Sequence, residues 1–340
     1  MAKREMIMMT AAKGKRPERT PVWIEVQMLI LPEYKKLDEK YGFDGIARNA
    51  ELAARATVMP VTELGVDAAI LFSDLLVPAE GMGIKVKLSD KGPKVENPVR
   101  TIKDVEKLIV PEPEEGMKNW LQTIRIAKKE LTGKAPIIGW VGAPFLLASF
   151  MVEGGVPAPF FNIKKMMYSE PKTVHLFFSK LADMAIKFLF AQVEAGAEIT
   201  MLFDIVAGAI SPWEYREFAL PHVQKIVSAI KTKGLPLIYH SNGTNFLPYI
   251  KDTEIDIIGL DWTVEMKNAV KVLEGKKVMQ GNMDPYLLLF GSKEQIAQSA
   301  KKIHEEAKDA RAHIFSLGGW IHKDTSVDKT KYLIDLVHSL

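Results

Sequence analysis

The amino-acid sequence predicts a single (β/α)8 TIM barrel. Short apolar runs rich in β-branched residues recur along the chain, separated by longer segments with helical spacing. This alternation is typical of βα units around a parallel sheet. Most of the runs are almost continuously apolar, as strands covered on both faces are. A length of 340 residues also fits one barrel. We therefore expect residues 1–340 to form one domain, with a surface excursion at about 78–113.

Eight apolar runs supply the predicted strands. In chain order they are Val22–Gln27, Ala68–Phe72, Ala135–Val141, Glu198–Phe203, Leu235–His240, Asp256–Asp261, Lys276–Gly281 and His313–Leu317. The carboxyl ends of parallel barrel strands meet at one mouth, where the active sites of this fold lie.

The segments between these strands carry helix signals. Apolar residues spaced three and four apart predict a helix over Thr173–Ala195. Ser211, followed by proline, predicts the start of a helix, and Gly234 predicts the end of that helix. Ser292, with Glu294 and Gln295 two and three residues later, predicts another start. The excursion at 78–113, rich in lysine, glycine and proline, predicts a small surface hairpin.

Composition narrows the classes of partner and chemistry. Lysine and arginine number 45 against 42 acidic residues, and no long run of like charge occurs. We therefore expect neither nucleic acid nor a membrane as a partner. The absence of cysteine excludes disulfides, thiolate nucleophiles and cysteine-ligated metals. No apolar leader or transmembrane stretch is visible, so the expected location is the cytoplasm.

Polar residues follow most of the predicted strands and are the candidates for a site at the barrel mouth. They are Glu25 and Gln27, Ser73 and Asp74, Gly142–Pro144, Asp204, His240–Asn242, Asp261–Trp262, Asn282–Asp284 and Gly318–Trp320.

Three of these carboxylates have structural alternatives. Asp74 ends an apolar run, so its charge needs a partner or a ligand. It either accepts hydrogen bonds from ligand N–H groups or caps the next segment through the amides of Leu75 and Leu76. Asp204 could simply tie down a loop, and Asp261 could be a buried anchor beside Trp262.

His240 is the other notable candidate. The His-x-Asn pair of His240 and Asn242 could shuttle a proton or contribute to a metal site. Without cysteine, any zinc would need His240 together with carboxylates such as Glu25, Asp74 or Asp204, and no spacing specifies that set. We therefore expect no metal site, and His240 as the ligand if one exists. A hydrogen-bonded structural histidine is the default interpretation.

Six ordered segments resemble one family, the uroporphyrinogen decarboxylases. They are Pro21–Trp23 with Leu31–Tyr34, Ala69–Asp74, Gly142–Phe145 with Phe150–Gly155, Phe218–Pro221, Gln280–Pro285 and Phe315–Gly318. The resemblance implies a (β/α)8 barrel, usually a homodimer. It also implies a carboxy-lyase that removes carboxyl groups from the four acetate side chains of uroporphyrinogen, with no metal or prosthetic group as cofactor.

The resemblance also assigns residues. Asp74 matches the family carboxylate that binds the pyrrole N–H groups, which makes it the predicted catalytic residue. The family's Arg-Gln-Ala-Gly-Arg stretch, which grips substrate carboxylates, is replaced here by Glu25–Ile30, without arginine. The family tyrosine, serine and histidine are replaced by Phe150, Ile205 and Gly319.

These replacements predict a more apolar pocket, lined by Val26, Leu29, Phe150 and Ile205. Such a pocket suits a tetrapyrrole or a smaller, less charged molecule, and we expect little decarboxylation of uroporphyrinogen itself. The predicted substrate-binding residues are Glu25, Gln27, Phe150, Asp204, His240 and Asn242.

Two alternatives stay open. The superfamily also contains corrinoid-dependent methyltransferases, and Tyr239–Gly243 resembles their zinc-binding region, with Asn242 where a cysteine would stand. Methyl transfer with a corrinoid protein partner would then use His240 and carboxylates. A binding protein or remodelled scaffold that keeps the barrel without its chemistry is the third interpretation.

Overall fold

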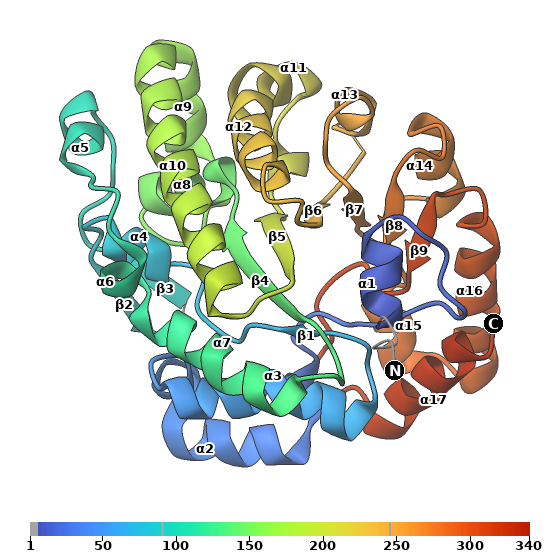
Figure 1. Cartoon of the computed structure of the whole chain (residues 1–340). Helices are drawn as coiled ribbons and strands as arrows, with labels where there is room; N and C mark the ends of the chain where they lie inside the picture. The colour runs from blue at the N-terminus through green and yellow to red at the C-terminus, as the bar shows by residue number, and fades with distance from the viewer. Residues whose placement is uncertain (1–5, 90–91, 245) are drawn as a thin grey trace.

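A computed structural model describes residues 6–89, 92–244 and 246–340. Over these residues, seven parallel strands form one sheet in the order β1-β4-β5-β6-β7-β8-β9. The strands are β1 (Ala69–Ile70), β4 (Ile137–Gly142), β5 (Ile199–Asp204), β6 (Leu237–Ser241), β7 (Ile257–Leu260), β8 (Val278–Gln280) and β9 (Ala312–Ile314). Figure 1 shows the helices around the outside of these strands. This confirms the predicted barrel.

The segment around Val22 closes the barrel between its two edges. Phe315, just after β9, donates its backbone N–H to the carbonyl of Pro21 (2.8 Å), and Trp23 donates to the carbonyl of Phe315 (3.2 Å). On the other side, the N–H of Asp67 donates to the carbonyl of Val22 (2.8 Å), two residues before β1 begins. These bonds satisfy backbone groups that an open sheet edge would expose.

The prediction of a strand over Val22–Gln27 is wrong beyond its start, because only Val22 forms a β-bridge. Val26 has left-handed backbone angles (φ 48°, ψ 29°), which end extended structure. The side-chain carbonyl of Gln27 accepts a hydrogen bond from the N–H of Ile24 (3.2 Å), and the 3₁₀ helix η1 (Gln27–Ile30) follows. The chain therefore turns into the mouth directly after Ile24.

The other seven predicted strands are confirmed, most of them shorter than expected. The shortest, β1, covers two residues of the predicted Ala68–Phe72. Beyond β9, Phe315 and Leu317 make only isolated bridges, to Val22 and Met283.

The helices mostly agree with their sequence signals. Their bounds are α1 (Ile7–Ala12), α2 (Pro32–Ala47), α3 (Ala50–Leu64), α4 (Val77–Gly81), α5 (Ile102–Lys107), α6 (Pro113–Gly116), α7 (Lys118–Leu131), α8 (Pro144–Glu153), α9 (Phe161–Ser169), α10 (Pro171–Ala195), the 3₁₀ helix η2 (Ala207–Ala209), α11 (Pro212–Glu214), the π-helix η3 (Tyr215–Ala219), α12 (Leu220–Lys231), α13 (Leu247–Ile250), α14 (Met266–Val272), α15 (Pro285–Phe290), α16 (Lys293–Glu306) and α17 (Val327–His338). The predicted helix over Thr173–Ala195 is α10. Ser211 and Ser292 form capping boxes at the starts of α11 and α16, and α12 ends three residues before Gly234.

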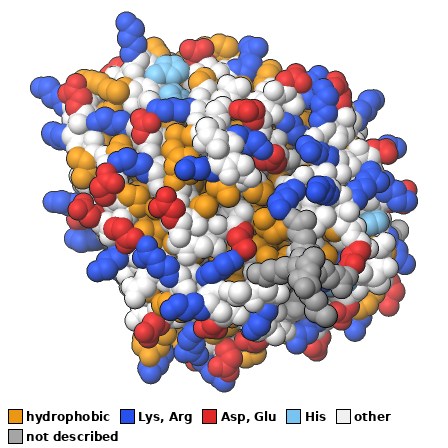
Figure 2. Space-filling model, in the orientation of Figure 1, with side chains coloured by type: hydrophobic (Ala, Val, Ile, Leu, Met, Phe, Trp, Pro, Cys, Tyr) orange, Lys and Arg blue, Asp and Glu red, His pale blue; other side chains and the backbone are white. Residues whose placement is uncertain are grey.

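The strands β2 (Val86–Ser89) and β3 (Gly92–Val95) form an antiparallel hairpin within the excursion after β1. On the face shown in Figure 2, lysine and arginine are interspersed with acidic side chains, and hydrophobic side chains show between them. Within the described ranges, none of the helices is both long enough and apolar enough to span a membrane.

Candidate active site

Two adjoining cavities open where the strands end. The apolar cavity, of about 420 Å³, is walled by aromatic side chains, namely Phe43, Phe72, Trp140, Phe150 and Phe203. The second cavity, of about 530 Å³, is called the polar cavity here because His240, Asn242 and Lys323 line it; apolar side chains, several of them from the segments that follow β7, β8 and β9, complete its lining. Glu25, Leu29, Ile205 and Trp320 line both, so the two cavities meet at these side chains.

The structure brings most of the predicted site residues to this mouth. Glu25, Asp74 and Phe150 line the apolar cavity, and Glu25, His240 and Asn242 line the polar one. Val26, Leu29 and Ile205 also lie in the apolar wall. Gln27 and Asp204 line neither cavity.

Glu25 and His240 form a buried pair where the two cavities meet. Glu25 Oε1 lies 3.3 Å from His240 Nδ1, and both side chains are almost fully buried. Burial raises the pKa of Glu25 to about 8 and lowers the pKa of His240 to about 4. Burial thus favours the uncharged form of both groups, a carboxylic acid beside a neutral imidazole. Neither Glu25 oxygen has a hydrogen-bond partner among the residues the structure describes.

Local backbone geometry puts the pair together. The turn at Val26 takes the chain away from the barrel wall directly after Glu25. On the neighbouring strand, Gly259 pairs in register with His240, and a Cβ atom there would lie 2.4 Å from His240 Nδ1. Glycine at position 259 thus leaves the space that the imidazole ring occupies.

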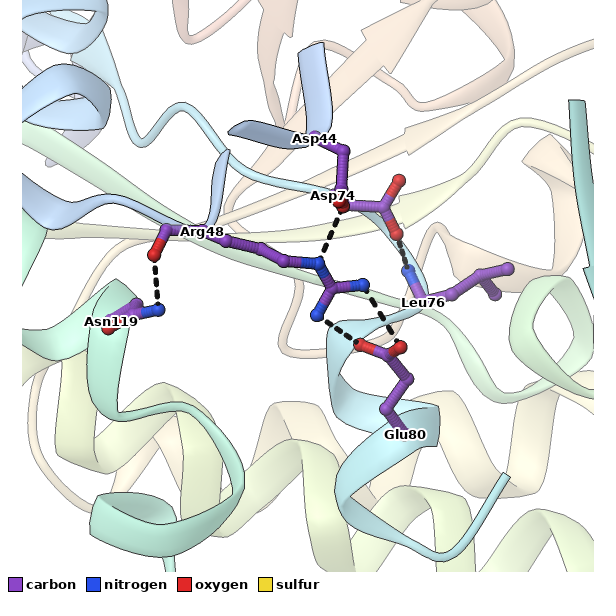
Figure 3. Close-up of polar contacts among 6 residues, drawn as sticks. All are labelled: Asp44, Arg48, Asp74, Leu76, Glu80 and Asn119. Atoms are coloured by element: carbon purple, nitrogen blue, oxygen red, sulfur yellow. Dashed lines mark hydrogen bonds and ion pairs between the residues drawn. The ribbon is translucent and has the colours of Figure 1, made fainter. Parts of the chain in front are cut away.

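Asp74 is the second carboxylate in the lining of the apolar cavity. One of its oxygens accepts a hydrogen bond from the N–H of Leu76 (2.8 Å), so Asp74 does cap the following turn. Burial, opposed by this hydrogen bond, raises the pKa of Asp74. Figure 3 shows Arg48 nearby, held by Asp44 (2.6 Å) and by both oxygens of Glu80 (3.1 and 3.2 Å). Asp74 therefore forms no ion pair with Arg48 or with any other arginine among the described residues.

Asp204 and Gln27 are buried behind the site. Asp204 accepts a hydrogen bond from the hydroxyl of Tyr239 (2.8 Å), which in turn accepts one from Tyr215 (3.2 Å). Burial raises the pKa of Asp204 to about 7. Gln27 uses its side-chain oxygen to hold the turn at Ile24. In this structure both residues make internal contacts.

Asp261 anchors the loop that carries Trp262 at the cavity rim. Its carboxylate accepts hydrogen bonds from the N–H of Gly243, from the N–H of Thr263 (2.6 Å) and from the Thr263 hydroxyl. Trp262 also packs against Gly318, where an added Cβ would lie 2.2 Å from the Trp262 backbone nitrogen. The anchoring role considered for Asp261 from the sequence is therefore observed.

Asp261→Ala should lower the free energy of unfolding by about 2–4 kcal/mol, because it leaves donors in two loops, those after β6 and β7, without their acceptor. Chemical denaturation followed by tryptophan fluorescence measures this change. Asp252→Ala is the matched control, since Asp252 is exposed and makes only a long ion pair with Lys276 (3.7 Å). A loss as small for Asp261→Ala as for the control would contradict the anchoring role.

Sequence reasoning missed several residues of the site. Tyr286 and Lys323 line the polar cavity, and Trp140 and Phe203 line the apolar one. Trp140 and Phe203 lie in strands that read as ordinary core, and Tyr286 lies in the short helix α15. Lys323 lies in a loop without any recognisable motif. Among the described residues, no group of three or more histidine, aspartate or glutamate side chains is arranged to hold a metal ion.

Comparisons with known proteins agree with this architecture. Residues 3–340 match the family model described as "Uroporphyrinogen decarboxylase (URO-D)". Uroporphyrinogen decarboxylase from Myxococcus xanthus (strain DK1622) is 43% identical over 333 residues, covering 97% of this chain and 95% of the relative. The enzyme of the same name from Carboxydothermus hydrogenoformans is 40% identical, with the same coverage of both chains.

A solved structure shares the fold at lower identity. A methyltransferase from Methanosarcina mazei superposes with a TM-score of 0.82 and is 22% identical, covering 98% of this chain and 97% of its own. At that identity the likeness shows the fold alone. The match over almost the whole sequence and the relatives at 40% identity or more establish that the chain belongs to the uroporphyrinogen decarboxylase family.

Proposed function

We propose that this protein is a carboxy-lyase of the uroporphyrinogen decarboxylase family that acts on a tetrapyrrole, or a related molecule, with fewer acidic side chains than uroporphyrinogen. The observation that carries the proposal is the position of Glu25, an almost fully buried carboxyl group at the junction of the two cavities, where burial raises its pKa to about 8. It lines both cavities and touches His240. A group that is still protonated at neutral pH is suited to act as a general acid.

Decarboxylation requires such an acid. The bond between the substrate carbon and its carboxylate breaks, CO2 leaves, and the electron pair remains on the carbon. Glu25 then donates its proton to that carbon, which forms the new C–H bond and leaves Glu25 ionised. A proton from water then restores Glu25. We assign its relay to His240, whose Nδ1 lies 3.3 Å from Glu25 Oε1, because a neutral imidazole accepts a proton at one nitrogen and donates from the other.

The apolar cavity supports the proposed choice of substrate. Its lining contains no lysine, arginine or histidine, and its acidic members are Glu25 and Asp74. Each unpaired carboxylate buried there would cost several kcal/mol, which weighs against a substrate with eight carboxylates. The reacting carboxylate is destabilised by the same surroundings, and this favours its loss as CO2. Asp74 is the acceptor that we assign to the pyrrole N–H groups.

Coproporphyrin III, with four carboxylates, should therefore bind about tenfold more tightly than uroporphyrin III, with eight, because fewer charges lose water. Titration followed by porphyrin absorbance measures both affinities. A parallel anaerobic assay should show little conversion of uroporphyrinogen III. Glu51→Gln, a change of an exposed residue on α3, is the control variant and should bind both porphyrins as the wild-type protein does.

Other outcomes would redirect the assignment. Rapid turnover of uroporphyrinogen III would contradict the proposed divergence of the pocket. Stoichiometric zinc in the purified protein, together with methyl transfer from a corrinoid protein, would favour the methyltransferase interpretation. Failure of every tetrapyrrole to bind would favour the remodelled scaffold.

A further inference from the structure

We propose that Lys323 binds a carboxylate of the substrate that does not react, and that the aromatic rim of the polar cavity holds the substrate body beside it. This inference rests on the proposed function and adds an orientation to it. The substrate would lie across both cavities. Its body would extend from the apolar cavity past Glu25, and one of its own carboxylates would reach Lys323 in the polar cavity.

Lys323 is an available cation at the polar cavity. It lines that cavity, and its side chain is exposed. No described residue forms an ion pair or a side-chain hydrogen bond with it, in contrast to its neighbour His322, which accepts a hydrogen bond from the N–H of Asp324 (3.2 Å). Glu25, the acidic side chain in the lining of this cavity, is almost fully buried beside His240 and forms no ion pair with Lys323. A ligand carboxylate would give Lys323 the charged partner it lacks.

The aromatic rim next to Lys323 is built to hold a flat molecule. Trp262, Tyr286 and Trp320 all line the polar cavity while remaining about half exposed, with exposed fractions of 42%, 54% and 59%. Large aromatic side chains left open at a cavity mouth offer ring faces for stacking. The rim is also held in place, because Asp261 anchors the Trp262 loop and Gly319 lies against the Trp262 ring.

The difference between the linings of the two cavities favours one orientation of the substrate. The apolar cavity has no cation, whereas the polar cavity offers Lys323 and the amide of Asn242. An acidic side chain therefore loses less by pointing into the polar cavity than into the aromatic one. Because Glu25 and Trp320 line both cavities, a substrate lying across them would touch the proposed acid with its reacting group.

The test uses two probes that share a ring system, coproporphyrin III and its neutral tetramethyl ester. Lys323→Gln should weaken binding of coproporphyrin III about threefold to tenfold, because one exposed ion pair is lost. It should leave the ester unchanged. Lys323→Arg should restore most of the affinity, and high salt should weaken wild-type binding but not binding by Lys323→Gln. Lys301→Gln, on the outer face of α16, is the matched control.

Failure of this inference differs from failure of the proposed function. Equal affinities of wild type and Lys323→Gln for coproporphyrin III would overturn the role of Lys323 and leave the Glu25 chemistry intact. An equal loss of affinity for acid and ester would mean that Lys323 acts only through the shape of the loop, and would also overturn it. If the wild-type protein binds neither probe, the tetrapyrrole ligand is wrong and this inference is overturned with it.

Discussion

Glu25→Gln is expected to reduce turnover by about 10²- to 10⁴-fold, the range for removing a general acid. Glutamine keeps the shape of the side chain but has no acidic proton to give to the carbon that loses CO2. The measurement is CO2 release from the tetrapyrrole that the wild-type protein decarboxylates fastest. Binding of that compound should change far less than turnover, because the lost interaction belongs to the transition state.

The same variant tests the protonation of Glu25 without a substrate. The pKa of Glu25 lies near 8 in the folded protein and near 4.5 in the unfolded chain, so the folded state holds this proton more tightly. The stability that this proton contributes is fully present below pH 4.5 and is lost as the pH rises to about 8. Between these pH values, the free energy of unfolding falls by about 1.4 kcal/mol per pH unit for one such group.

Denaturation at a series of pH values measures this dependence, and Glu25→Gln should remove its share of the slope. Infrared spectroscopy at neutral pH should also show a protonated carboxyl band that is weaker in Glu25→Gln. Asp204, with a pKa of about 7, makes the free energy of unfolding depend on pH in the same direction, and Glu25→Gln leaves that contribution in place. A wild-type profile that matches that of Glu25→Gln would mean that Glu25 is ionised, and would remove it as the acid.

Asp74→Asn should weaken tetrapyrrole binding by about 1–3 kcal/mol, or roughly five- to 150-fold, the range for losing a hydrogen bond to a charged group. The pyrrole N–H groups need an acceptor, and the apolar surroundings of Asp74 strengthen each bond to its carboxylate. Asparagine can still accept the hydrogen bond from the N–H of Leu76, so the turn should remain. Absorbance titration of coproporphyrin III measures the affinity.

Asp44→Asn is the control for Asp74→Asn. Asp44 is a nearby carboxylate, but its partner is Arg48 and it does not line the apolar cavity. Affinity should therefore stay within about twofold of wild type, as expected for an exposed ion pair. If Asp74→Asn also binds like the wild-type protein, Asp74 serves as a turn cap and the ligand acceptor lies elsewhere.

The order of strands and the helix caps were predictable because they depend on local signals. Apolar runs such as Ile199–Asp204 must be covered on both faces, and a serine at position 211 or 292 satisfies the free N–H groups of the helix that follows. The first strand was not predictable. Its apolar residues fit an extended chain, but Val26 takes left-handed backbone angles, and its side chain packs against a core assembled from distant parts of the chain.

The sequence by itself determined the barrel, the family likeness and the positions at which polar groups end the strands. The carboxyl ends of the strands in a parallel barrel meet at one mouth, irrespective of the conformation of the loops. The sequence therefore predicted that four residues would lie near one another: Glu25, Asp74, His240 and Asn242. Only the tertiary structure decided what each does. Burial depends on every neighbouring element, and it raises the pKa of Glu25 and encloses the hydrogen bond between Asp204 and Tyr239. The loop after β9 places the exposed Lys323 in the lining of the same cavity as the aromatic rim, without an ion-pair partner among the described residues. These are properties of surroundings drawn from distant parts of the chain, so no local pattern in the sequence encodes them.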